Sequence, residues 1–391
     1  MEAATSMTGA PKFTRARKSD DRLVFQFAGV GPEDMTVSVI LPGDFPHEDL
    51  LVLGPVLEDA GVLTPGYVPP PIGLCHSEGF LYEQSVEHRE TILLPDRNIV
   101  SRWARIAKGA PADDASRLAA GVLALAQCLE IKVEPSVAFH ELASGQSNES
   151  ANDEIAWFRA ADNGVPRQWL DYALGRIATL PSALHPHALT NHDLAYPLRR
   201  WSRNYAVALK IGQLELDGLS PLHRMLGLLD WMEREFIVAG PAALMACLYF
   251  APHSPPRKGL LKQLKSADRE RALAGARNVA WDITYLSDFV RRVNEAEGKL
   301  IRYLFATMDK SLQLLAAGLF EYGGDGFRPD ILQRDMARWW PAADAKAISA
   351  RMDALFVIAA ASVDSPRERR DGDFVTDAIS RGEHSLRSFR P

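Results

Sequence analysis

Four acidic side chains that are far apart in the chain each follow or lie within an apolar segment. They are Asp96, Glu141, Asp282 and Asp309. Carboxylate oxygens are the ligands that hard divalent cations such as Mg²⁺ or Mn²⁺ prefer in proteins. An ion held in this way can neutralise charge on a phosphate and make a water nucleophilic. The question is therefore which elements could bring such remote carboxylates together.

The segments around these acids predict strands that alternate with helices. The predicted strands are 91–95, 131–133 and 300–306, and the predicted helices are 116–129, 269–295 and 344–363. This alternation is typical of an α/β fold with a parallel sheet covered on both faces. Ligands of such sheets bind at the carboxyl ends of the strands, which points to Asp96 and Asp309.

In four segments the chain resembles the PIN-like family of metal-dependent nucleases. That family has a strand ending in an acid with Asn two residues on, and a Ser followed by a helical Glu-Leu. It also has an acid on a later helix and a strand ending in Thr-x-Asp. The matching residues are Asp96 with Asn98, Ser136 with Glu141 and Leu142, Asp282, and Thr307 with Asp309. The match lies mainly in 89–145 and 270–318.

The resemblance implies a nuclease that acts on RNA and holds Mg²⁺ or Mn²⁺. Its metal ligands and catalytic residues would be Asp96, Glu141, Asp282 and Asp309. Three further side chains would orient the carboxylates or a ligand water through hydrogen bonds: Asn98, Ser101 and Thr307. A metal-bound water would attack the phosphorus in line, without a covalent enzyme intermediate.

Each acid also has a structural alternative. Asp96 and Asp309 could cap the helices that follow them. Glu141 could be a solvated helix residue, with Glu134 as a rival. Asp282 could pair with a neighbouring arginine, either Arg277 or Arg291, and Asp288 could take its place.

The interval from Glu141 to Asp282 predicts a large helical insertion at about 150–265. Arginines interleaved with aromatic residues there could grip phosphates and stack on bases, although solvated helix faces have the same composition. The candidate substrate-binding residues are Arg199, Arg200, Arg203 and Lys210, together with Arg97 beside the first acid. The insertion could instead hold a protein partner, in a non-catalytic scaffold protein that keeps an α/β core.

Two other groups of residues are weaker candidates for a metal site or a catalytic nucleophile. His185, His187 and His192, with Asp193, could bind Zn²⁺, but they lack the i, i+4 spacing of a helical zinc site and fit a surface loop. Cys128 has no histidine placed to activate it and is expected to pack inside a helix.

Composition sets the broad class. The 391 residues carry a net charge of -6, so no overall basic field collects nucleic acid. Three scattered cysteines and the absence of a long apolar segment favour a reduced, cytoplasmic protein outside the membrane. The expected organisation is a disordered tail (1–20), a small N-terminal α/β unit (21–88), a PIN-like domain with the insertion (89–363) and a mobile tail (364–391).

Overall fold

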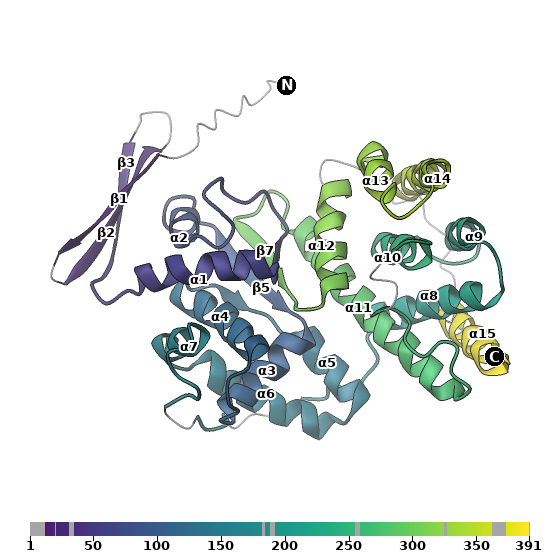
Figure 1. Ribbon diagram of the computed structural model, residues 1–391, viewed down its shortest axis with the longest axis horizontal. Coiled ribbons are helices and arrows are strands. Elements are labelled where there is room, and N and C mark those ends of the chain that lie inside the picture. The colour runs from purple at the N-terminus through teal and green to yellow at the C-terminus, as the bar shows by residue number, and fades with distance from the viewer. Residues whose placement is uncertain are drawn as a thin grey trace. The chain divides into compact units, whose positions relative to one another are not determined.

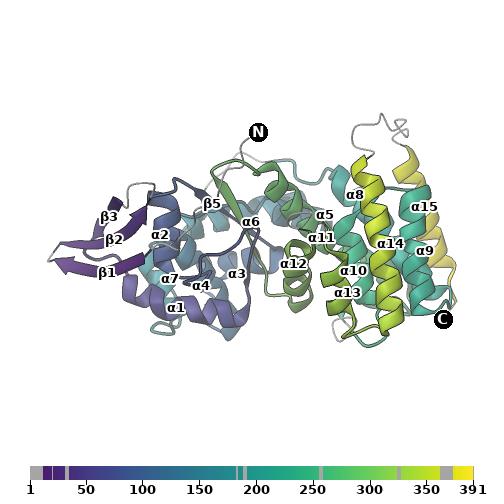
Figure 2. The same cartoon turned by 90° about the horizontal axis from the view of Figure 1, so that it is seen from above.

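The computed structural model describes residues 12–19, 21–30, 35–181, 184–187, 192–254, 259–323, 327–361 and 373–390. The chain divides into two compact units. Unit 1 consists of Met1–His192 and Arg292–Met308, and unit 2 consists of Asp193–Arg291 and Asp309–Pro391. The α/β class is confirmed, since unit 1 contains a mixed sheet among helices and the described part of unit 2 is helical (Figures 1 and 2).

The main sheet of unit 1 has four strands in the order β4–β7–β5–β6. They are β4 (Leu63–Pro65), β7 (Ile301–Ala306), β5 (Glu90–Pro95) and β6 (Lys132–Val133). The strands β6, β5 and β7 are mutually parallel, and β4 is antiparallel to β7. The last three residues of β5 and of β7 are all buried. Because successive side chains point to opposite faces, both faces of the sheet are covered at its carboxyl end.

Seven helices accompany this sheet in the described part of unit 1. They are α1 (His47–Ala60), α2 (Ser77–Ser85), α3 (Arg97–Ala107), α4 (Asp114–Cys128), α5 (Ser136–Gly145), α6 (Asn148–Asp162) and α7 (Pro166–Ala173). Helix α3 packs against α6, and α4 packs against α7. Trp103 of α3 is fully buried and donates through Nε1 to the carbonyl of Ala119 on α4, at 2.7 Å.

A second sheet in unit 1 is antiparallel, in the order β1–β2–β3. Its strands are β1 (Lys12–Ser19), β2 (Arg22–Val30) and β3 (Met35–Pro42). The buried rings of Phe25 and Phe27 on β2 lie edge-on to His47 of α1 and Tyr82 of α2. The alternation of apolar residues along β2 thus attaches one face of this sheet to the helices.

The described part of unit 2 contains eight helices. They are α8 (Arg199–Leu216), α9 (Pro221–Arg234), α10 (Gly240–Phe250), α11 (Arg269–Glu295), α12 (Lys310–Gly323), α13 (Pro329–Met336), α14 (Ala342–Ala361) and α15 (Asp373–Ser388), of which α11 ends in unit 1. Nine consecutive residues at the end of α10 are buried, which accounts for the longest apolar run of the sequence. No described helix is long and apolar enough to span a bilayer.

The structure corrects four boundaries expected from the sequence. Residues 12–19 of the expected N-terminal tail form β1, because they pair with β2. The expected division at 88/89 is absent, because β4 pairs with β7 in the main sheet. Helices α6 and α7, expected in the insertion from about 150, pack in unit 1. Part of the expected C-terminal tail is helix α15, which packs against α8.

Candidate carboxylate site at the end of β5

Asp96 lies directly after β5, at the carboxyl end of the parallel strands, and is 2% exposed. Its Oδ2 accepts hydrogen bonds from Asn98 Nδ2 at 2.6 Å and from Thr307 Oγ1 at 2.5 Å. Its Oδ1 accepts from the backbone N–H of Ile99 at 3.1 Å. Three donors therefore fix the orientation of this buried carboxyl group.

The sheet register explains why Thr307 reaches Asp96. Pro95 and Ala306 are partners in the parallel pair β5–β7, so the residues after them leave the sheet side by side. Asp96 N–H donates to the Ala306 carbonyl at 2.9 Å, and Thr307 N–H donates to the Val62 carbonyl at 3.0 Å. Thr307 is fully buried. Its hydroxyl is thus held rigidly beside the carboxylate.

Asn98 forms hydrogen bonds with residues that follow both β5 and β7. It lies in the first turn of α3 and donates to Asp96, while its Oδ1 accepts from the backbone N–H of Met308 at 3.3 Å. Ser101 lies elsewhere: its hydroxyl donates to the Arg97 carbonyl of its own helix, at 2.8 Å. The structure thus brings Asn98 and Thr307, two of the three predicted orienting residues, onto Asp96.

Asp96 also caps a helix. It is the N-cap residue of α3, as the structural alternative expected. Capping and metal binding are compatible roles for one carboxylate, since Oδ1 makes the cap and the orienting donors act on Oδ2.

The neighbouring basic residue Arg97 is half-buried, and its Nε is buried without a hydrogen-bond partner. It acts electrostatically on Glu154 of α6, whose pKa is raised by burial and lowered in part by Arg97 and then by Lys108. One carboxylate oxygen of Glu154 is likewise buried without a hydrogen-bond partner.

Unit 1 contains two further acids singled out from the sequence, Glu141 and its rival Glu134. Glu141 is half-buried on α5. Glu134 directly follows β6, and its Oε1 accepts from the backbone N–H of Ser136 at 2.9 Å and lies 3.8 Å from a guanidinium nitrogen of Arg292. Because β5 and β6 are parallel neighbours, Glu134 belongs to the same edge of the sheet as Asp96.

The other two predicted ligands belong to unit 2. Asp309 accepts from the backbone N–H groups of Ser311 at 2.8 Å and Leu312 at 3.1 Å, at the start of α12. Asp282 is half-buried on α11. Its rival Asp288 binds Arg200 at 3.1 Å and Arg291 at 2.8 Å. Among the residues that the structure describes, no three His, Cys, Asp or Glu side chains form a group that could hold an ion.

The basic residues predicted to bind substrate have different surroundings. Arg199 and Arg203 are exposed on α8. Arg200 is held by Asp288, and Lys210 lies over the Trp231 ring, 5.8 Å from its centroid. The neighbouring aromatic residues form a stack of Trp201 on Tyr205 and beside Trp281. Tyr205 and Trp281 are buried, so they belong to the core of unit 2 rather than to a base-stacking surface.

The histidine cluster and Cys128 are weaker candidates for a functional site. His185, His187 and His192 are exposed, and residues 188–191 between them lie outside the described part of the chain. Burial raises the pKa of the Cys128 thiol to about 11, which disfavours a nucleophilic thiolate.

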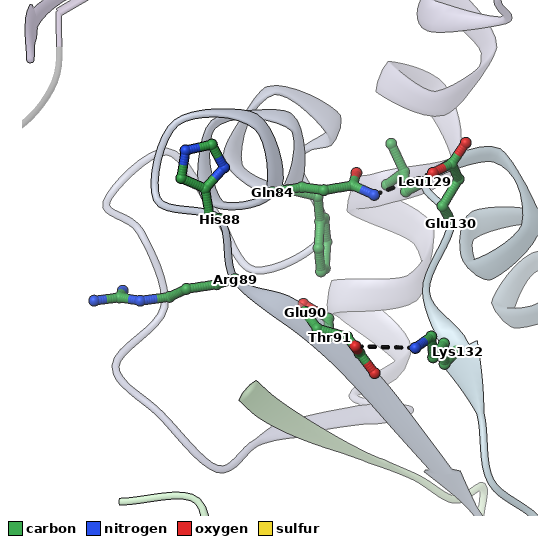
Figure 3. Close-up of a pocket in the computed structure, with 9 residues that line it drawn as sticks. Gln84, His88, Arg89, Glu90, Thr91, Leu129, Glu130 and Lys132 are labelled. Atoms are coloured by element: carbon green, nitrogen blue, oxygen red, sulfur yellow. Dashed lines mark hydrogen bonds and ion pairs between the residues drawn. The ribbon is translucent and has the colours of Figure 1, made fainter. Parts of the chain in front are cut away.

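A cavity of about 330 Å³, which no sequence pattern predicts, lies at the opposite, amino-terminal edge of the same strands (Figure 3). Its lining comes from three separate segments. Two of the lining residues, His88 and Glu130, have positive φ angles, which cannot be predicted from their residue types.

Comparisons of the chain with protein-family models, with curated proteins and with solved structures found no match.

Proposed function

We propose that this protein is a divalent-metal-dependent nuclease that acts on RNA in the cytoplasm, with a PIN-like core in unit 1. One observation carries the proposal: a buried aspartate at the carboxyl end of a parallel strand is oriented by Asn98 and by Thr307 from the neighbouring strand. This is where ligands of α/β sheets bind.

The chemistry of this site suits a hard cation. The Asp96 carboxylate offers oxygen atoms, and it is held by Asn98 and Thr307 in the manner of a metal ligand with outer hydrogen-bonding partners. Bound Mg²⁺ or Mn²⁺ would neutralise charge on a phosphodiester and lower the pKa of a water molecule. The further ligands Glu141, Asp282 and Asp309, and the substrate contacts of Arg97, Arg199, Arg200, Arg203 and Lys210, stay predictions from the sequence.

The test compares two N-cap aspartates. Asp113 caps α4 through Ser116 N–H at 2.6 Å, as Asp96 caps α3 through Ile99 N–H. Asparagine is also a good N-cap, so Asp→Asn keeps the cap and removes the charge. We expect Asp96→Asn to abolish Mn²⁺-dependent cleavage of a fluorogenic RNA, and Asp113→Asn to leave it unchanged. Equal cleavage by wild type and Asp96→Asn would contradict the proposal.

A second candidate is a non-catalytic scaffold protein whose helical unit 2 holds a protein partner. It is favoured by the capping of α3 and α12 by Asp96 and Asp309, which gives both acids a structural role. A metal site present only in the folded protein raises the thermal midpoint when Mn²⁺ is added. The nuclease proposal expects that increase in wild type and its loss in Asp96→Asn, whereas the scaffold expects none.

A further inference from the structure

The cavity at the amino-terminal edge of the main sheet lies away from the Asp96 edge of the same strands. It is bounded by α2, by the residues before and at the start of β5, and by the end of α4 with the start of β6. Its volume of about 330 Å³ is at the lower end of the range of small-molecule sites. Phe80 and Leu129, both buried, supply its apolar wall.

Two acids, Glu90 and Glu130, and two bases, Arg89 and Lys132, line the cavity, so the charge that a ligand meets depends on how these side chains are paired. Arg89 is turned toward Glu83 and Glu87, at 3.2 and 3.1 Å, and points away from Lys132 in Figure 3. Lys132 is paired with Glu90 at 2.9 Å.

Glu130 has a different partner. It accepts a hydrogen bond from the neutral amide of Gln84, at 3.2 Å, and within the described residues no cationic side chain forms an ion pair with it. Glu130 is exposed, so its negative charge is available to a cationic ligand.

Two helices strengthen this negative potential. Helices α2 and α4 end at Ser85 and Cys128, immediately before the segments that line the cavity. The C-terminal end of a helix carries the negative pole of its dipole and favours nearby cations. The amino-terminal edge of this sheet is thus a place where a positively charged group is stabilised by the fold.

The backbone conformation explains how the Glu130 side chain comes to line the cavity. Glu130 has φ 51°, and the N–H groups of Glu130 and Ile131 bond back to the carbonyls of Gln127 and Ala126. This is the helix-ending arrangement in which glycine is the usual residue at the left-handed position. His88, also in the lining, has φ 54°. Strained non-glycine positions concentrate at functional sites, and at position 130 the strain places a carboxylate on the cavity.

We propose that this cavity binds a small organic cation, a primary alkylammonium group on an aliphatic chain. The ammonium group forms ion pairs with the carboxylates of Glu130 and Glu90, and the aliphatic chain packs on Phe80 and Leu129. The pair of Lys132 and Glu90 is exposed and therefore weak. A ligand that contacts both carboxylates and also the apolar wall can therefore take the place of Lys132. The source is either a free amine or a lysine side chain of a polypeptide.

Calorimetric titration of the full chain with butylamine tests the proposal, with butan-1-ol as the neutral control of similar shape. We expect saturable binding of butylamine alone, weakened about twofold to fivefold in Glu130→Gln and strengthened in Lys132→Met, which removes the competing cation. Equal affinity of wild type and Glu130→Gln, or equal heats from the amine and the alcohol, would overturn it.

A second variant guards against misfolding. Glu130→Gly places the favoured residue at the left-handed position, so it folds at least as well as wild type, yet it must weaken butylamine binding as Glu130→Gln does. Unchanged affinity in this variant would also overturn the proposal. Nα-acetyl-lysine methylamide distinguishes the sources: binding as tight as that of butylamine indicates a polypeptide lysine, and weaker binding indicates a free amine.

Discussion

Thr307 donates a hydrogen bond to Asp96, although 211 positions separate the two residues in the chain. The contact is a direct result of the parallel pairing of β5 with β7, because each residue follows the last pair of that register, Pro95 and Ala306. A hydroxyl and a carboxylate buried together form a polar pair whose loss is costly, since either group alone would lack its partner away from water.

Replacement of Thr307 by valine removes the hydroxyl and preserves the shape of the side chain. We expect Thr307→Val to lower the free energy of unfolding by about 1–3 kcal/mol, because the buried carboxylate of Asp96 loses a donor. Thr307→Ser keeps the hydroxyl and serves as the control, with a loss below about 1 kcal/mol. Denaturant unfolding measures both. Similar losses in the two variants would show that packing, and not the hydrogen bond, matters at this position.

Asn98 and Ser101 were predicted to share one role, and the structure separates them. Asn98 bonds both Asp96 and the backbone of Met308, whereas Ser101 bonds only within its helix. Asn98→Ala should therefore lower the unfolding free energy by about 1–3 kcal/mol. Ser101→Ala should change it by less than about 0.5 kcal/mol. Denaturant unfolding measures both changes. A larger loss of unfolding free energy in Ser101→Ala than in Asn98→Ala would be inconsistent with these contacts.

The different outcomes at Asn98 and Ser101 show what a sequence can reveal about this site. The apolar runs at 91–95 and 300–306 predict strands, and their parallel pairing brings Asp96 close to Thr307. A serine inside a helix can instead bond the carbonyl four residues earlier, and residue type alone does not distinguish this from a role at the site.

Unit boundaries were harder to predict than elements. The expected helix 269–295 agrees in both bounds with α11, and the expected strands 91–95 and 300–306 lie within one residue of β5 and β7. Periodicity identifies the buried face of a helix but not the partner that covers it. For this reason the sequence pattern places α6 in the insertion, whereas the structure packs it against α3 of unit 1. Strand β4 is three residues long and ends in a proline, too short for a periodic pattern.

Glu154 should make stability depend on pH. Its pKa is raised by burial, so the folded protein binds the proton more tightly than the unfolded chain does. The free energy of unfolding therefore falls as pH rises from the usual glutamate pKa through the raised one. We expect Glu154→Gln to melt above wild type near pH 8, with a difference that shrinks toward about pH 4.

The control for this prediction is Glu149→Gln, which changes an exposed acid on the same helix. Because Glu149 lies in the first turn of α6, where the helix dipole stabilises a negative charge, its replacement should slightly lower the melting temperature near pH 8, opposite in sign to Glu154→Gln. A Glu154→Gln difference that stays constant, or grows in acid, would contradict the assigned direction of the Glu154 pKa.

The C-terminal helix α15 offers a test of the corrected tail. Its apolar face follows helical spacing: Ala378 and Leu386 are buried, and Gly382 between them faces Leu209 of α8. A Cβ at position 382 would lie 2.7 Å from Leu209 Cβ, so the helices would have to separate. Gly382→Ala should lower the unfolding free energy by about 1–3 kcal/mol.

The control is Gly145→Ala, at the end of α5. The new Cβ there meets no atom within 4 Å, so the unfolding free energy should be unchanged or slightly increased. If Gly382→Ala were equally harmless, α15 would not pack on α8 in solution, and the charged C-terminal segment would be the mobile tail that its composition suggested.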